Sequence, residues 1–169
     1  MRYHKSILFW VFVFLLMTGS RTKEIRLTEG IQPGNLAPEI HGQAINLKGN
    51  TFVLLQFWAA YDAHSRMENV QMYNAISQLK AEDIRLISVS LDESEAVFEG
   101  IVKAEHLDPA TQFNDSQGKN SATFKKYHLN TGFTNRLISP EGIIIAKNVN
   151  PKEISRCIEM YRSVSHGVF

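Results

Sequence analysis

The sequence is very poor in cysteine, with Cys157 the only one among 169 residues. One thiol cannot form an intramolecular disulfide, a cysteine-rich zinc site or a dithiol redox pair. Basic residues are not in excess either, because 18 Lys and Arg accompany 17 Asp and Glu, for a formal charge of +1. A nucleic-acid-binding protein usually shows a clear basic surplus, so this balance gives no support to that class of partner.

Long apolar runs are also scarce, and the clearest one is Ile7–Met17. Its eleven residues fall short of the roughly 20 that a membrane-spanning helix needs. The run follows the cations Arg2 and Lys5 and ends in small residues, a pattern typical of an export signal. We therefore expect residues 1–20 to be a signal peptide or a retained N-terminal membrane anchor. The rest of the chain would then be exported, lying in the periplasm or anchored to the membrane facing it.

Residues 21–33 are mostly polar and indicate a linker, followed by one domain over residues 34–165. Strand and helix patterns alternate along this domain, and a pair of short strands flanks a Pro-Glu-Gly turn near its end. The expected strands are 51–57, 84–91, 135–139 and 143–147, and the expected helices are 63–81, 94–106, 121–127 and 152–163. This order predicts an α/β fold whose mixed central sheet is flanked by helices and ends in a β-hairpin and a C-terminal helix.

Several segments carry a resemblance to a known family. They are Gly34–Ile40, Leu47–Asn50, Val53–Tyr61, Phe113–Gly118 and Leu137–Gly142. Together they resemble the TlpA/ResA-like thioredoxin family, within the wider AhpC/TSA (peroxiredoxin-like) superfamily. The resemblance covers about residues 34–163 and implies a thioredoxin-like fold. It also implies descent from thiol-disulfide oxidoreductases.

The family's redox motif is missing. After Phe-Trp-Ala the family has a Cys-x-x-Cys pair, and here those two positions are Asp62 and Ser65. Thiol-disulfide exchange needs a thiolate to attack sulfur and a second thiol to resolve the mixed disulfide. Neither a carboxylate nor a serine hydroxyl can do this. The family's cis-proline is missing too, because its position is Phe133, where we expect a trans peptide.

Two interpretations of the substituted motif stay open. Asp62 stands at the expected start of a helix, where its carboxylate would cap free N–H groups and meet the positive end of the helix dipole. Alternatively, Asp62, His64 and Glu68 could form a new metal or acid/base site, since all three are suitable groups. We favour the cap, and expect no metal and no other cofactor.

The lone thiol lies on an apolar face of the last predicted helix, beside Ile154, Ile158 and Tyr161. This placement favours an inert, buried Cys157. The alternatives are an intermolecular disulfide, or a thiol-disulfide oxidoreductase or antioxidant activity retained in altered form through Cys157 alone.

Aromatic residues gather around the substituted motif. Trp58, Tyr61 and Phe133 would lie near one another in a thioredoxin-like fold, with His64 beside them. They either form an exposed apolar patch that binds a partner or fill the space left by the lost site. The sequence thus favours a redox-inactive binding or structural module of the cell envelope, whose partner is a protein or peptide.

Overall fold

The computed structural model describes residues 27–40, 45–79 and 83–166. The expected export signal, residues 1–20, lies outside these ranges. Among the described residues, no helix combines the length and the apolar character needed to cross a bilayer.

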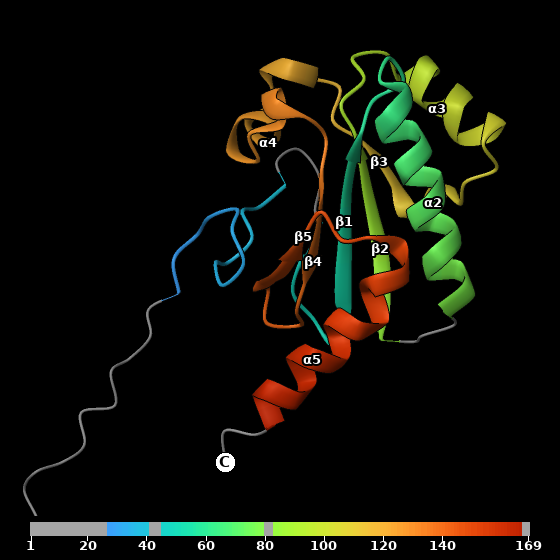
Figure 1. Ribbon diagram of the computed structural model, residues 1–169. Coiled ribbons are helices and arrows are strands. Elements are labelled where there is room, and N and C mark those ends of the chain that lie inside the picture. Colours follow the sequence, from blue (N-terminus) through green and yellow to red (C-terminus); the bar gives the residue numbers. More distant parts are fainter. Residues whose placement is uncertain (1–26, 41–44, 80–82, 167–169) are drawn as a thin grey trace, which may run out of the picture.

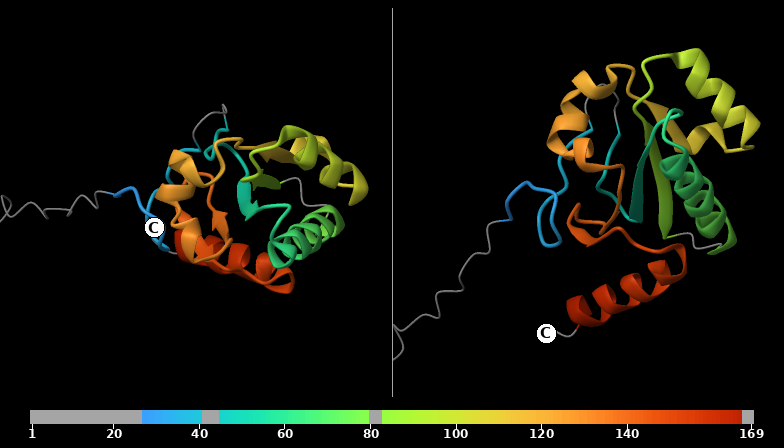
Figure 2. Two further views of the ribbon diagram at one scale, coloured as in Figure 1. Left: turned by 90° about the horizontal axis from the view of Figure 1, so that it is seen from above. Right: turned by 45° about the horizontal axis from the view of Figure 1, so that its top comes forward.

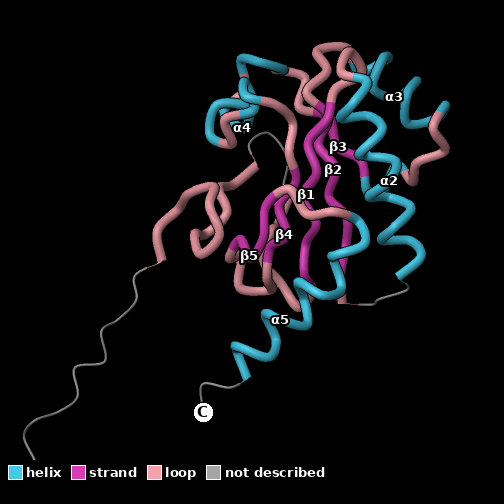
Figure 3. Tube along the Cα trace, in the orientation of Figure 1, coloured by secondary structure: helices cyan, strands magenta, loops and turns pink. Residues whose placement is uncertain are grey.

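A five-stranded mixed sheet forms the centre of the protein, in the order β3-β2-β1-β4-β5 (Figures 1 and 3). β1 runs parallel to β2 and β2 to β3, whereas β4 is antiparallel to both β1 and β5. The strands are β1 (Phe52–Trp58), β2 (Ile84–Ser90), β3 (Gln112–Asn114), β4 (Asn135–Ile138) and β5 (Ile144–Lys147). The helices are α2 (Ala63–Leu79), α3 (Glu95–Ala104), α4 (Ala122–Lys126) and α5 (Ile154–His166). The predicted mixed sheet with a terminal hairpin and helix is confirmed.

Helices cover both faces of the sheet (Figure 2). Successive side chains of a strand point to opposite faces, so Leu55 and Leu54 of β1 belong to different cores. The face of Leu55 is covered by α4 and by residues 37–40 and 45–47. The face of Leu54 is covered by α2 and α5, and α3 packs beside α2 against Trp58.

Three details differ from the sequence prediction. β3 was not expected as a strand, because three residues are too few to show an alternating pattern. Helix α3 is shorter than 94–106: Ser94 is its N-cap, accepting the Val97 N–H, and His106 has a positive φ of 54° that ends the helical conformation. Helix α5 begins at Ile154, after one turn of 3-10 helix.

Part of the expected linker is hydrogen-bonded to the domain. The Gly30 N–H donates to the Leu36 carbonyl and the Leu36 N–H to the Thr28 carbonyl, both at 3.0 Å. The Gly34 N–H, at a φ of 93° that favours glycine, donates to the Ile144 carbonyl of β5 at 2.8 Å. These bonds hold residues 28–36 against the hairpin edge of the sheet.

A row of polar side chains crosses the sheet beneath α2. The strand register places Asn135, Gln56, Ser88 and Gln112 side by side on one face. Asn69 of α2 is fully buried above them, accepting the Ser88 hydroxyl at 2.5 Å and donating its Nδ2 to Gln112 Oε1 at 3.1 Å. Because buried polar groups need partners, these bonds fix where α2 sits on the sheet.

Candidate functional site

The site predicted from the sequence lies where β1 ends and α2 begins. Asp62 immediately precedes the helix, and its Oδ1 accepts the Ser65 N–H at 2.8 Å. The capping role predicted for Asp62 is therefore confirmed. The cap satisfies one of the N–H groups that the first helical turn leaves without a partner.

The Ser65 hydroxyl completes the same turn. Its Oγ donates to the Asp62 carbonyl at 3.0 Å and accepts the Ala59 N–H at 3.3 Å. The Ser65 residue is only 1% exposed. The two residues at the family's cysteine positions thus bond to each other and to the backbone, and the hydroxyl is closed to solvent.

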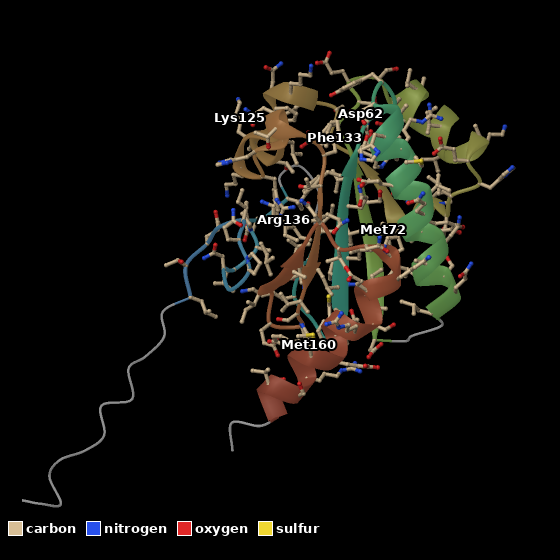
Figure 4. The ribbon with its side chains drawn as sticks, in the orientation of Figure 1. Asp62, Met72, Lys125, Phe133, Arg136 and Met160 are labelled. Carbon is tan, nitrogen blue, oxygen red and sulfur yellow. The ribbon has the colours of Figure 1, made fainter. Side chains whose placement is uncertain are left out.

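The aromatic residues divide into a buried one and an exposed pair. Tyr61 is 59% exposed, and its ring centroid lies 6.2 Å from that of the half-buried Phe133. Trp58 is 0% exposed and packs against Phe98 with centroids 6.0 Å apart. Trp58 therefore belongs to the core and not to a contact surface, because its side chain shares the α2 face of the sheet. Figure 4 shows Phe133 and Asp62 at the same end of the sheet.

The backbone beside Phe133 has an unexpected support. The described residues contain no cis peptide bond, as the loss of the proline predicted. Instead, Arg136 is 1% exposed, and its Nη1 donates to Thr134 Oγ1 at 2.6 Å and to the Asn135 carbonyl at 2.8 Å. No carboxylate forms an ion pair with Arg136 in the described part of the chain. Burial lowers the pKa of its guanidinium. The guanidinium bonds to the neutral oxygens of Thr134 and Asn135, and these bonds stabilise the backbone that follows Phe133.

The possible metal or acid/base trio does not converge. His64 Nε2 lies 3.5 Å from Glu68 Oε1, one turn along α2, whereas the Asp62 carboxylate is engaged by the Ser65 N–H. Within the described ranges, no three His, Cys, Asp or Glu side chains gather as metal ligands would. Arg66 forms an ion pair with Glu105 and ties α2 to the end of α3.

Cys157 belongs to α5, a helix that Figures 1 and 4 show at the end of the sheet opposite to the start of α2. The thiol is half-buried in the apolar cluster of β1, α2 and α5. Burial raises the pKa of the Cys157 thiol, the nearby Glu153 raises it further, and Arg156 opposes both. A raised pKa lowers the thiolate fraction and hence the reactivity of the sulfur.

Two hollows flank the Tyr61–Phe133 pair. One, of about 360 Å³, lies between α2 and the loop after β5 and includes His64, Glu68 and Phe133 in its lining. The other, of about 640 Å³, lies between the turn before α2 and the loop between β2 and α3. It is lined by Ala60, Tyr61, Leu91, Asp92, Glu93, Ser94, Val97 and Lys119. The sequence reasoning missed this second groove, although Asp92 follows β2 at the strand end that lies beside Trp58.

Asp92 joins the two strand ends. Both of its carboxylate oxygens accept the Ala60 N–H, at 3.0 and 2.8 Å, and Oδ2 also accepts the Ser90 hydroxyl at 2.7 Å. The pKa of Tyr61 is raised by partial burial, followed by the negative charges of Asp92, Asp62 and Glu93. The positive charge of Lys119 lies close to this ring, with its Nζ 5.4 Å from the Tyr61 ring centroid.

Several solved structures are similar to this chain in fold and in sequence. A thioredoxin-like protein from Parabacteroides distasonis is 44% identical, with a TM-score of 0.75, over 79% of this chain and 99% of that one. The chain belongs to the thioredoxin-like family, of the TlpA/ResA type. The C-terminal domain of a putative thiol-disulfide oxidoreductase from Bacteroides thetaiotaomicron is 29% identical, with a TM-score of 0.58, over 66% of this chain and 77% of that one.

A thiol-disulfide oxidoreductase from Bacteroides fragilis is 26% identical over 67% of this chain and 82% of that one, with a TM-score of 0.58. No protein-family model matches the sequence, and no curated protein matches it. Within a family of thiol-disulfide oxidoreductases, this member has a single cysteine, so it has no dithiol pair.

Proposed function

We propose that this thioredoxin-like protein is a redox-inactive binding module of the bacterial cell envelope, which engages a protein or peptide partner through Tyr61 and Phe133. One observation carries the proposal: Asp62 and Ser65, at the cysteine positions, are both engaged in capping α2. The family's scaffold is kept while its chemistry has been replaced by a structural contact. A thioredoxin-like scaffold that lacks the two cysteines can still bind a partner.

The exposed aromatic pair supports binding at this end of the sheet. Tyr61 keeps more than half of its surface in solvent although it lies on a turn fixed by the bonds of Asp62 and Asp92. A large aromatic side chain on a rigid turn loses little conformational entropy when a partner covers it. The hollows on either side of the pair add concave surface.

The loss of redox activity is tested by insulin reduction with dithiothreitol as the electron source. A thioredoxin that has an intact Cys-x-x-Cys pair is the positive control. We expect the purified protein to give the uncatalysed rate. Turnover that disappears in Cys157→Ala would instead support an oxidoreductase that acts through its lone thiol.

The binding surface is tested by cross-linked capture from envelope extract, followed by binding of the captured partner in purified form. The variant is Tyr61→Ser with Phe133→Ser. A matched control is Met160→Ser with Val164→Ser, because these side chains are 57% and 69% exposed on α5, away from the site. We expect the first variant to lose the partner and the second to keep it. Equal binding by both variants would contradict the proposed surface.

Export is tested separately, by fractionation of cells that express the full chain. We expect the protein in the periplasmic or the membrane fraction, and the mass of the mature chain distinguishes a cleaved signal from a retained anchor. Recovery of the full-length chain in the cytoplasmic fraction would contradict the proposed location in the cell envelope.

A further inference from the structure

The groove between Tyr61 and Val97 has an apolar floor and an exposed aromatic wall. Leu91 and Ala60 form part of the floor, and Val97 of α3 is 46% exposed at the side facing solvent. A groove of this kind loses water when an apolar segment covers it, which favours association. The groove lies on the β2–α3 side of Tyr61, away from the loop of Phe133.

The charges around the groove have one dominant sign. Asp92 is 5% exposed and belongs to the lining, and its neighbour Glu93 is exposed at the rim. In the described part of the chain, neither carboxylate forms an ion pair with a Lys, Arg or His. With Asp62, three negative charges act on Tyr61, and the positive charge of Lys119 opposes them. The groove is thus complementary to a cation.

The Tyr61 ring already holds a cation from this chain. Lys119 Nζ lies 5.4 Å from its centroid, within the distance at which a cation is attracted to an aromatic face. Lys119 itself is exposed and pairs with no carboxylate among the described residues. A lysine on the surface is free to move aside, so this contact occupies the ring without closing the groove.

We infer that the groove of Tyr61, Asp92, Glu93 and Val97 binds a peptide segment of the partner in which an arginine or lysine lies beside apolar residues. The basic side chain would displace Lys119 from the face of Tyr61 and approach Glu93, while the apolar neighbours cover Val97 and Leu91. This inference rests on the proposed binding function and names the chemistry of the partner. Lys119 acts as an internal competitor of the incoming cation.

The test is a titration of the isotope-labelled full chain with the peptide acetyl-Gly-Leu-Arg-Leu-Gly-amide, followed by NMR. We expect saturable shifts in residues 60–61, 91–97 and 119. Two further peptides carry glutamate or neutral norleucine in place of arginine, and both should bind more weakly. Raising the ionic strength from about 0.05 M to about 0.5 M should weaken the arginine peptide selectively, because salt screens exposed charges.

Two substitutions are expected to change the affinity for the arginine peptide in opposite directions. Lys119→Met keeps the apolar stem and removes the competing charge, so the arginine peptide should bind about two- to fivefold more tightly, the size of an exposed cation–π contact. Glu93→Gln should weaken binding by a similar factor. Glu99→Gln, an exposed position on α3 outside the groove, is the matched control and should leave the affinity unchanged.

Several results would overturn the inference. They are equal affinities for the arginine and glutamate peptides, shifts confined to the hollow of Phe133 and Pro151, or weaker binding by Lys119→Met. Spermidine binding as tightly as the peptide would also overturn it, since it would assign the groove to free amines. If the captured partner needs Tyr61 and Phe133 but ignores the changes at Glu93 and Lys119, this inference fails while the proposed function stands. Insulin reduction, in contrast, would remove the proposed function whatever the peptides show.

Discussion

The start of α2 and the face of α5 that carries Cys157 differ in what each provides for a reactive thiol. The start of α2 offers a helix N-terminus, whose free N–H groups stabilise a negative charge, but Asp62 and Ser65 supply no sulfur. The face of α5 holds the sulfur of Cys157, but burial and Glu153 raise the pKa of that thiol.

The difference shows that a reactive thiol depends on its surroundings as much as on the sulfur atom. A thiolate is favoured by a helix N-terminus or nearby cations and is disfavoured by apolar burial. In this protein the favourable place is taken by a carboxylate, which uses the same N–H groups for stability. The three predictions that follow test this contrast, beginning with the one of largest expected effect.

Returning sulfur to the start of α2 should restore thiol chemistry. In a Cys157→Ala background, Asp62→Cys with Ser65→Cys should form a disulfide under mild oxidation and reduce insulin above the uncatalysed rate. The reason is that the first position lies at the helix N-terminus and the second is buried one turn behind it. Disulfide formation is measured by mass spectrometry, and Asp62→Cys alone is the control. If the double variant stays fully reduced, the site has lost more than its cysteines.

Removing the cap should destabilise the domain. Asp62→Ala should lower the free energy of unfolding by roughly 0.5–2 kcal/mol, the usual cost of losing an N-cap side chain. Asp62→Asn keeps an oxygen acceptor and should lose only the charge–dipole part, about 0.3–1 kcal/mol. Both are measured by denaturant unfolding. Unchanged stability in Asp62→Ala would show that the hydrogen bond to the Ser65 N–H contributes nothing.

The thiol of Cys157 should respond to pH in the manner of a buried group. Its pKa is raised in the folded protein, so alkylation should be slow near neutral pH and should accelerate only above the pH at which the unfolded chain reacts. The folded state keeps the proton longer than the unfolded state. The stability that the neutral thiol contributes is therefore complete below the unfolded pKa and is lost as pH rises through the folded pKa.

Cys157→Ala should remove this small alkaline decrease in stability and change little at neutral pH. The measurement is a pair of denaturant-unfolding titrations, one at a pH below the pKa of the unfolded thiol and one at a pH above the pKa of the folded thiol. Alkylation rates are measured with and without denaturant. Fast alkylation of the folded protein at neutral pH would place Cys157 in solvent and return the oxidoreductase alternative to consideration.

The sequence by itself determined the local features. The strands and helices that have a clear hydrophobic period were predicted to within a few residues, and so was the cap at Asp62, because these depend on neighbours along the chain. The loss of the dithiol pair was also certain from the sequence, since it needs only a count of cysteines.

Only the tertiary structure decided which side chains meet. It buried Trp58 against Phe98 and placed Lys119 over the Tyr61 ring. It also aligned the polar row beneath α2 through the register of four strands. Such neighbours lie tens of residues apart along the chain. Their contact is set by strand pairing and helix packing, which no local pattern of residues records.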